Sequence, residues 1–229
     1  MLGRVSSTPT RVVIADDQDL VRAGFRLILD AQDGIEVVGE AADGLACVEL
    51  ARALRPDVCL VDVRMPKLDG LEVTRLLSGP GATHPTAVVV VTSFDQDDYL
   101  NVALRNGACG FLLKDATPAL LVEAVRAAAR GDALVSPAVT VRLLKQLEER
   151  ASAPGNDVGV PESSLSAREL EVARLVAVGR TNQEISDQLC LSLSTVKTHL
   201  GHIHHKLGVR NRVEVAAWAW GNGAVRAGR

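Results

Sequence analysis

This chain of 229 residues has no long hydrophobic run and no paired cysteines, and from its polar first residues we expect no secretory leader. The longest purely aliphatic segment covers five residues, 87–91, whereas a membrane-spanning helix takes about 20. The first ten residues are polar and lack the apolar core of a signal peptide. The four cysteines (47, 59, 109 and 190) are scattered, which argues against disulfides and thiolate metal sites. We therefore expect a cytoplasmic protein without membrane contact, whose cysteines are reduced core residues.

The net charge of −3 conceals a difference between the two ends of the chain. Residues 1–162 carry 16 Lys and Arg against 23 Asp and Glu, whereas residues 163–229 carry 9 against 5. Four of the five histidines also lie in the second segment. The basic segment is the candidate for contact with a polyanion, although a solvated basic face would give the same count.

Strand and helix patterns alternate five times before residue 131. Apolar runs that end in polar residues predict strands, and apolar residues at helical spacing predict the helices between them. Such alternation predicts an α/β fold, a doubly wound parallel sheet of five strands in the order 2-1-3-4-5. The strands are expected at 11–15, 35–38, 58–62, 86–91 and 109–113, and the helices at 20–28, 45–54, 71–77, 97–106 and 117–130.

The rest of the chain predicts a second, smaller domain. We expect a disordered tail at 1–10, the α/β domain at 11–131, and a helix followed by a flexible linker at 132–162. Residues 163–229 show short helical patterns without strands, which predicts a small all-α domain of four helices.

Asp62 follows the buried strand 58–62 directly, where ligands bind in open α/β sheets. Taken alone, this carboxylate is equally suited to capping the next helix. Asp16 and Asp17 end the first strand and converge on the same crevice, where three carboxylates need a counter-cation such as Mg²⁺. Thr92 adds a hydroxyl, and Lys114 adds an ammonium in a chain with 5 lysines and 20 arginines. This combination predicts a site that accepts a phosphoryl group.

Four separated motifs, 14–17, 61–66, 91–93 and 110–114, resemble the signatures of a response-regulator receiver domain over residues 11–131. The resemblance implies that Asp62 accepts a phosphoryl group from a sensor histidine kinase. It also implies that Asp16, Asp17, Asp62 and the Arg64 carbonyl hold Mg²⁺, and that Thr92, Lys114 and Phe111 bind and sense the phosphoryl group. A plain core role for Phe111 remains an alternative.

Haloacid-dehalogenase-type phosphatases also form an aspartyl-phosphate on a doubly wound sheet. They need a second aspartate two residues after the nucleophile as general acid, and here that position is Arg64. We therefore expect no enzyme activity beyond self-phosphorylation and slow hydrolysis of the aspartyl-phosphate.

In the basic segment, capping boxes begin at Ser166 and Thr181, and a third helix is expected from about residue 194 to 207 after Ser192. On a helical wheel its apolar residues form one buried stripe. The opposite face carries hydroxyls, imidazoles and a lysine but no carboxylate, which suits a DNA major groove, although a merely solvated face would look similar. The four histidines lack the spacing of a metal site.

The motifs 165–169, 182–185, 195–200 and 206–212 resemble a LuxR-type helix-turn-helix. Gly201 departs from the family, whose members often carry a polar or basic residue there. The whole chain resembles a NarL/FixJ-class response regulator, which implies a homodimer when phosphorylated, bound to double-stranded promoter DNA at paired half-sites. The alternative is a phosphorylation-independent regulator of the same fold, gated by a ligand or partner. The expected DNA contacts are Ser194, Lys197, Thr198, His202, Lys206 and Arg212.

Overall fold

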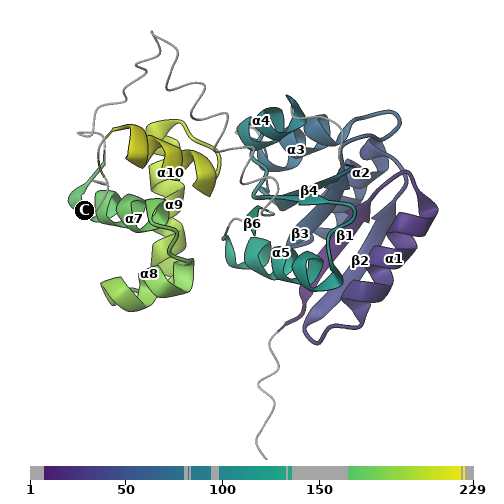
Figure 1. Ribbon diagram of the computed structural model, residues 1–229, viewed down its shortest axis with the longest axis horizontal. Coiled ribbons are helices and arrows are strands. Elements are labelled where there is room, and N and C mark those ends of the chain that lie inside the picture. Colours follow the sequence, from purple (N-terminus) through teal and green to yellow (C-terminus); the bar gives the residue numbers. More distant parts are fainter. Residues whose placement is uncertain are drawn as a thin grey trace, which may run out of the picture.

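The computed structural model describes residues 8–79, 82, 84–93, 98–132, 134–135, 165–222 and 224. It forms an α/β domain and a helical domain, whose elements are labelled in Figure 1. The helix expected at 138–150 and the linker after it lie outside the described residues, as do the first seven residues of the expected tail. Thr10, the last residue of that tail, instead begins the first strand, and its N–H donates to the Gly34 carbonyl.

The N-terminal domain is a parallel sheet in the order β2-β1-β3-β4-β5-β6. The expected order 2-1-3-4-5 is confirmed, and the predicted strands lie within about three residues of the observed bounds. A sixth strand of two residues was not expected; it pairs with the start of β5. The strands are β1 (Thr10–Ala15), β2 (Ile35–Ala41), β3 (Val58–Asp62), β4 (Ala87–Thr92), β5 (Gly110–Leu113) and β6 (Leu134–Val135).

Helices cover both faces of the sheet (Figure 1). α1 and α5 pack on one apolar cluster, and α2, α3 and α4 pack on the other. The central strand β3 is buried at all five positions, as expected for a strand covered on both faces. The helices are α1 (Asp19–Asp30), α2 (Gly44–Leu54), α3 (Gly70–Ser78), α4 (Asp98–Arg105) and α5 (Pro118–Arg130).

The turn between β3 and α3 holds the end of β3 tightly. Asp69 is the N-cap of α3, and its carboxylate accepts from the Glu72 N–H at 2.8 Å, so Asp62 is not needed as a cap. Gly70 donates its N–H to the Val63 carbonyl at 2.8 Å. A Cβ on Gly70 would lie 2.0 Å from the Asp62 carbonyl oxygen, so only glycine permits this close approach.

The C-terminal domain consists of α7 (Ala167–Ala177), α8 (Asn182–Leu189), α9 (Leu193–Leu207) and α10 (Arg212–Gly221) around a single apolar cluster. Both capping boxes are present, at Ser166 with Glu169 and at Thr181 with Glu184. Ser192 is the N-cap of α9, as expected.

Three cysteines agree with the expected core role and one does not. Cys47 and Cys59 are buried and Cys109 is half-buried, but Cys190, which ends α8 in the left-handed conformation, is exposed. None of the helices in the described parts of the chain is both long and apolar enough to cross a lipid bilayer.

Candidate functional site

Three carboxylates meet at the carboxyl ends of β1 and β3. Oxygen atoms of Asp16, Asp17 and Asp62 all lie within 4.8 Å of one another. Asp16 and Asp62 are 1% and 4% exposed, whereas Asp17 is exposed. The structure therefore brings together the three acidic residues that the sequence placed at these strand ends, because the carboxyl ends of neighbouring parallel strands meet at one edge.

Lys114, just after β5, reaches into this cluster. Its Nζ lies 2.7 Å from Asp16 Oδ2 and 3.0 Å from Asp62 Oδ2, and its side chain is only 13% exposed. Burial opposes the charge on Lys114, but hydrogen bonds to the two carboxylates outweigh it and raise the pKa of Lys114. One ammonium thus serves two buried carboxylates, which leaves the cluster with an excess of negative charge.

Burial raises the pKa of Asp62 above its ordinary value, and the charge of Asp16 adds to this effect. Lys114 and the backbone N–H of Arg64 oppose it through hydrogen bonds. The ionised form of Asp62 is therefore held at a cost in free energy, which a further cation beside the cluster would relieve.

The hard carboxylate oxygens and their closeness fit Mg²⁺, which prefers oxygen ligands. Within the described ranges, no other set of three or more acidic, cysteine or histidine side chains comes together in this way. A hollow of about 420 Å³ beside the cluster is lined by Asp17, Arg64 and Tyr99, among others, and gives access from solvent.

The other predicted residues of this site differ in their surroundings. Thr92, at the end of β4, is half-buried, and its hydroxyl donates to the Ser93 carbonyl at 3.2 Å. Phe111 is 3% exposed and packs in the cluster under α2, α3 and α4. The side chain of Arg64 is exposed, and its backbone N–H bonds to Asp62.

In the C-terminal domain, α9 has the two faces predicted by the helical wheel. Its apolar residues Val196, Leu200, Ile203 and Leu207 are buried. On the opposite face the predicted DNA contacts are exposed, and a Cβ on Gly201 would meet no atom within 4 Å. These exposed contacts are Ser194, Lys197, Thr198 and His202.

Lys206, also predicted to contact DNA, has a partner inside the domain that the sequence reasoning missed. Its Nζ lies 2.6 Å from Glu169 Oε2, and Glu169 is 3% exposed. Burial of Glu169 is outweighed by hydrogen bonds from Lys206 and from Ser166, which lower the pKa of Glu169 to about 2. Lys206 therefore links α9 to the capping box of α7.

The sixth predicted contact, Arg212, lies between the two domains, in a junction that the sequence did not indicate. Asp132 Oδ1 accepts from the Asn182 N–H at 2.9 Å, and Asn182 Oδ1 accepts from Arg212 Nη1 at 2.7 Å. Arg212 Nη1 is 3.8 Å from Asp132 Oδ1, while its Nη2 is buried without a partner among the described atoms. We call Asp132, Asn182 and Arg212 the interdomain junction.

Two further contacts join the domains at the end of α4. Asn211 donates from Nδ2 to the Leu104 carbonyl at 2.5 Å, and Arg210 donates to the Arg105 carbonyl. Figure 1 shows α10 on the side of the C-terminal domain that faces the N-terminal one. We call this arrangement, with the junction formed, the closed arrangement.

Comparison with known proteins finds similarity along most of the chain. Residues 12–126 match the family described as "Response regulator receiver domain", and residues 163–219 match "Bacterial regulatory proteins, luxR family". The transcriptional regulatory protein LiaR of Bacillus subtilis is 39% identical over 93% of this chain and 97% of its own.

Solved structures with both parts are also similar. The response regulator ChrA of a heme-sensing two-component system is 36% identical, with a TM-score of 0.51 over 96% of this chain and 100% of its own. A structure of two RcsB dimers bound to two parallel DNAs is 25% identical, with a TM-score of 0.54 over 96% of this chain and 100% of that one.

Proposed function

The chain belongs to the response regulators that join a receiver domain to a LuxR-type DNA-binding domain and control transcription, and from this premise we propose that Asp62 accepts a phosphoryl group from a sensor histidine kinase. It is a transcription factor of a two-component system and not an enzyme. The observation that carries the proposal is the meeting of Asp16, Asp17 and Asp62 within 4.8 Å beside the ammonium of Lys114.

In the transfer, a carboxylate oxygen of Asp62 attacks the phosphorus atom while the bond between phosphorus and the donor's imidazole nitrogen breaks. Lys114 lies within hydrogen-bond distance of Asp62, so its charge is in place for the negative charge that arrives with the phosphoryl group. Asp16, Asp17, Asp62 and the Arg64 carbonyl would hold Mg²⁺, which when bound supplies positive charge against the phosphoryl oxygens.

Thr92 and Phe111 are the residues proposed to change their contacts when Asp62 is phosphorylated. The Thr92 hydroxyl bonds only to the neighbouring Ser93 carbonyl among the described residues, a long bond that is readily exchanged for one to a phosphoryl oxygen. Phe111 is buried behind this strand end, so movement of Thr92 toward Asp62 changes the packing beneath α4.

Such a change at α4 bears on DNA binding because α4 contacts the C-terminal domain. Arg210 and Asn211 donate to carbonyls at the end of α4, and Arg212 is held in the interdomain junction. Gly131 also lies close to Lys197, since a Cβ added to Gly131 would be 3.7 Å from Lys197 Cε. We infer that phosphorylation opens the closed arrangement, which frees Arg212 and moves the receiver domain away from the exposed Lys197, so that both can contact DNA phosphates.

The proposed active form is a homodimer on two half-sites about one helical turn, or 34 Å, apart. The RcsB dimers in complex with DNA support both partners by similarity. Exposed apolar residues on α1 offer a surface for the dimer, because Leu20 is 86% exposed and Leu27 is 75% exposed one heptad later. We propose a cytoplasmic protein, because its proposed partner is promoter DNA.

Mass spectrometry after incubation with acetyl phosphate and Mg²⁺ tests the phosphoacceptor. We expect the mass of one phosphoryl group to be gained by the protein and by the Asp69→Asn variant, whose amide retains the capping role at α3. Asp62→Asn should gain none. Absence of any gain, or a gain that survives Asp62→Asn, would favour a regulator gated by a ligand or partner.

DNA binding is tested on the phosphorylated protein with Lys197→Ala. Loss of one phosphate contact should weaken binding to all sequences and lower the slope of log K against log salt by about 1. Unchanged affinity and slope would contradict the placement of α9 against DNA.

A further inference from the structure

A cavity of about 750 Å³ lies away from the acidic cluster, between the ends of α2 and α3 and the loop before α10. Four arginines line it (Arg52, Arg55, Arg75 and Arg210), and none of its 14 lining residues is acidic. This concentration of positive charge is unusual because residues 1–162 carry seven more acidic than basic residues. Arginine is the side chain best suited to hold phosphate, since its planar fork donates to two oxygens at once.

The charges of this cavity are poorly neutralised by the protein itself. Arg52 and Arg55 are exposed and their side chains have no carboxylate partner in the described part of the chain. The side chain of Arg210 donates to a neutral carbonyl, that of Arg105. Arg75 alone pairs with an acid, Glu72, at 2.8 Å. At least three guanidinium groups are therefore available to an anion.

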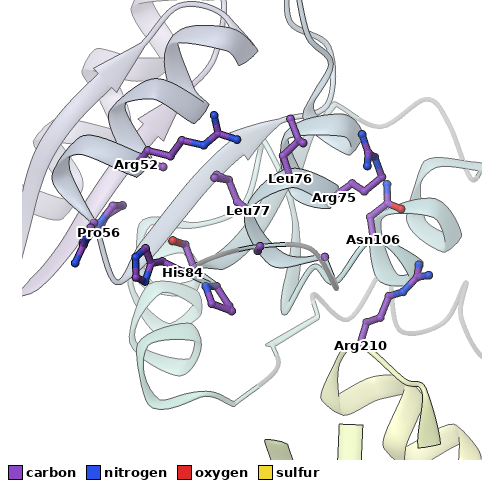
Figure 2. A pocket seen from close by; sticks show the side chains of 14 residues that line it. Arg52, Pro56, Arg75, Leu76, Leu77, His84, Asn106 and Arg210 are labelled. Carbon is purple, nitrogen blue, oxygen red and sulfur yellow. The ribbon is translucent and has the colours of Figure 1, made fainter. Parts of the chain in front are cut away.

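The remaining walls suit an organic group. Pro56, Leu76 and Pro85 supply apolar surface, and Asn106 supplies an amide. The volume falls within the range of about 300–1,000 Å³ that is usual for small-molecule sites. In Figure 2, Arg52 lies on one side of the cavity, Arg75 and Asn106 on the other, and Arg210 reaches toward them from a separate part of the chain.

We propose that this arginine-lined cavity binds a small molecule with at least two phosphate groups and holds the closed arrangement. Guanidinium groups lie on both sides of the cavity (Figure 2), so a ligand with two phosphate groups can offer a separate acceptor to each side. Arg210 belongs to the C-terminal domain, and the other three arginines belong to the receiver domain. A ligand that contacts both domains binds the closed arrangement more tightly and thereby opposes DNA binding.

The probes are ADP, inorganic pyrophosphate and adenosine, titrated calorimetrically into the full-length protein in EDTA so that the acidic site holds no divalent ion. ADP and pyrophosphate share the diphosphate, and a tighter fit of ADP would show that the apolar walls take the organic part. Adenosine should not bind. The titration requires neither Asp62 nor a phosphodonor. Absence of ADP binding would therefore not contradict phosphorylation at Asp62, and absence of phosphorylation would not contradict ADP binding.

Variants locate the site. Arg52→Ala and Arg55→Ala should each weaken ADP binding about tenfold, and Arg52→Lys, which keeps the charge but loses the fork, should weaken it less. The matched control is Arg126→Ala on α5, which covers the opposite face of the sheet. Absence of saturable binding of ADP and pyrophosphate at about 1 mM, or equal binding by the Arg52, Arg55 and Arg126 variants, overturns the proposal.

DNA affinity tests the bridging role. Saturating ADP should weaken DNA binding by the unphosphorylated protein and leave DNA binding by Arg52→Ala unchanged. Equal DNA affinity of the wild type with and without ADP overturns the bridging role. Weaker DNA binding by Arg52→Ala in the absence of ADP would instead identify the arginines as DNA contacts and overturn the proposed ligand.

Discussion

The acidic cluster of the receiver domain and the interdomain junction are both buried polar sites, but they are held together differently. Asp16, Asp62 and Lys114 come from strand ends fixed by the register of one sheet, and Lys114 lies within 3.0 Å of both carboxylates. In the junction, Arg212 is 3.8 Å from Asp132, and its buried Nη2 has no partner among the described atoms. A buried guanidinium nitrogen without a partner is costly, and the junction also depends on two domains staying in contact, so it is suited to opening. The acidic cluster also carries a cost, but its residues are held in place by the strands of a single sheet.

The largest expected effect concerns the acidic cluster. Lys114→Ala should slow phosphorylation of Asp62 by acetyl phosphate about a hundredfold, because the positive charge beside the reacting oxygens is removed. The comparison variant is Lys67→Ala, whose ammonium pairs with Asp43 at 2.7 Å in the turn before α3. Equal rates for the two variants in a mass-spectrometric time course would refute a role for Lys114 in the transfer.

The ion pair between buried Glu169 and the more exposed Lys206 lies inside the DNA-binding domain and extends the comparison, because it too should contribute to stability. Glu169→Gln should lower the free energy of unfolding by about 2 kcal/mol, since Lys206 loses its partner. The folded-state pKa of Glu169 is about 2, below its ordinary value of 4.5, so this stability is present above pH 4.5 and is lost as the pH falls toward 2.

Urea unfolding from pH 6 to pH 3 measures this loss. Glu171→Gln is the control, because Glu171 pairs with Arg168 at the surface, where ion pairs contribute little. A Glu169→Gln variant that matched Glu171→Gln at pH 6 would mean that the pair adds no stability.

The next expected effect is smaller and concerns the opening of the interdomain junction. Asp132→Ala removes the acceptor of the Asn182 N–H, and we expect DNA affinity of the unphosphorylated protein to rise about tenfold. Glu123→Ala provides the control, because Arg130 pairs with both Asp132, at 3.3 Å, and Glu123, at 2.9 Å, but Glu123 has no described contact with the second domain. Fluorescence anisotropy with a labelled duplex reports both affinities, and an unchanged value for Asp132→Ala would remove the junction from the control of DNA binding.

The smallest expected effect tests whether the ionised form of buried Asp62 lowers the free energy of unfolding. Burial and Asp16 raise the pKa of Asp62, so its ionised form destabilises the fold at neutral pH, and stability is regained as the pH falls through the folded-state pKa. Without Mg²⁺, Asp62→Asn should therefore raise the free energy of unfolding by about 1 kcal/mol. Thermal unfolding in EDTA at pH 7 measures this gain, and added Mg²⁺ should stabilise the wild type more than the variant.

The acidic cluster was predictable from the sequence because one rule connects residues far apart in the chain. Parallel strands bring their carboxyl ends together, so Asp16, Asp62 and Lys114 had to meet once the strands were identified. The buried stripe of α9 followed from helical periodicity in the same way.

The contacts between elements were not predictable, because no local pattern encodes them. Asn182 looked like an ordinary first residue of a helix but is 1% exposed in the junction. Lys206 looked like a surface cation but pairs with Glu169, 37 positions earlier. The two-residue strand β6 was too short for any alternation to appear.

We propose that Arg212 serves in two places that exclude each other. In the closed arrangement its guanidinium bonds to Asn182, and on promoter DNA we propose that it bonds to a phosphate. A substitution of Arg212 that changes its contact with Asn182 also changes its proposed contact with DNA. DNA binding by the unphosphorylated protein and DNA binding by the phosphorylated protein therefore cannot be adjusted separately at this position. To lower the DNA affinity of the unphosphorylated protein without lowering that of the phosphorylated protein, one has to change Asp132 or Asn182 and keep Arg212.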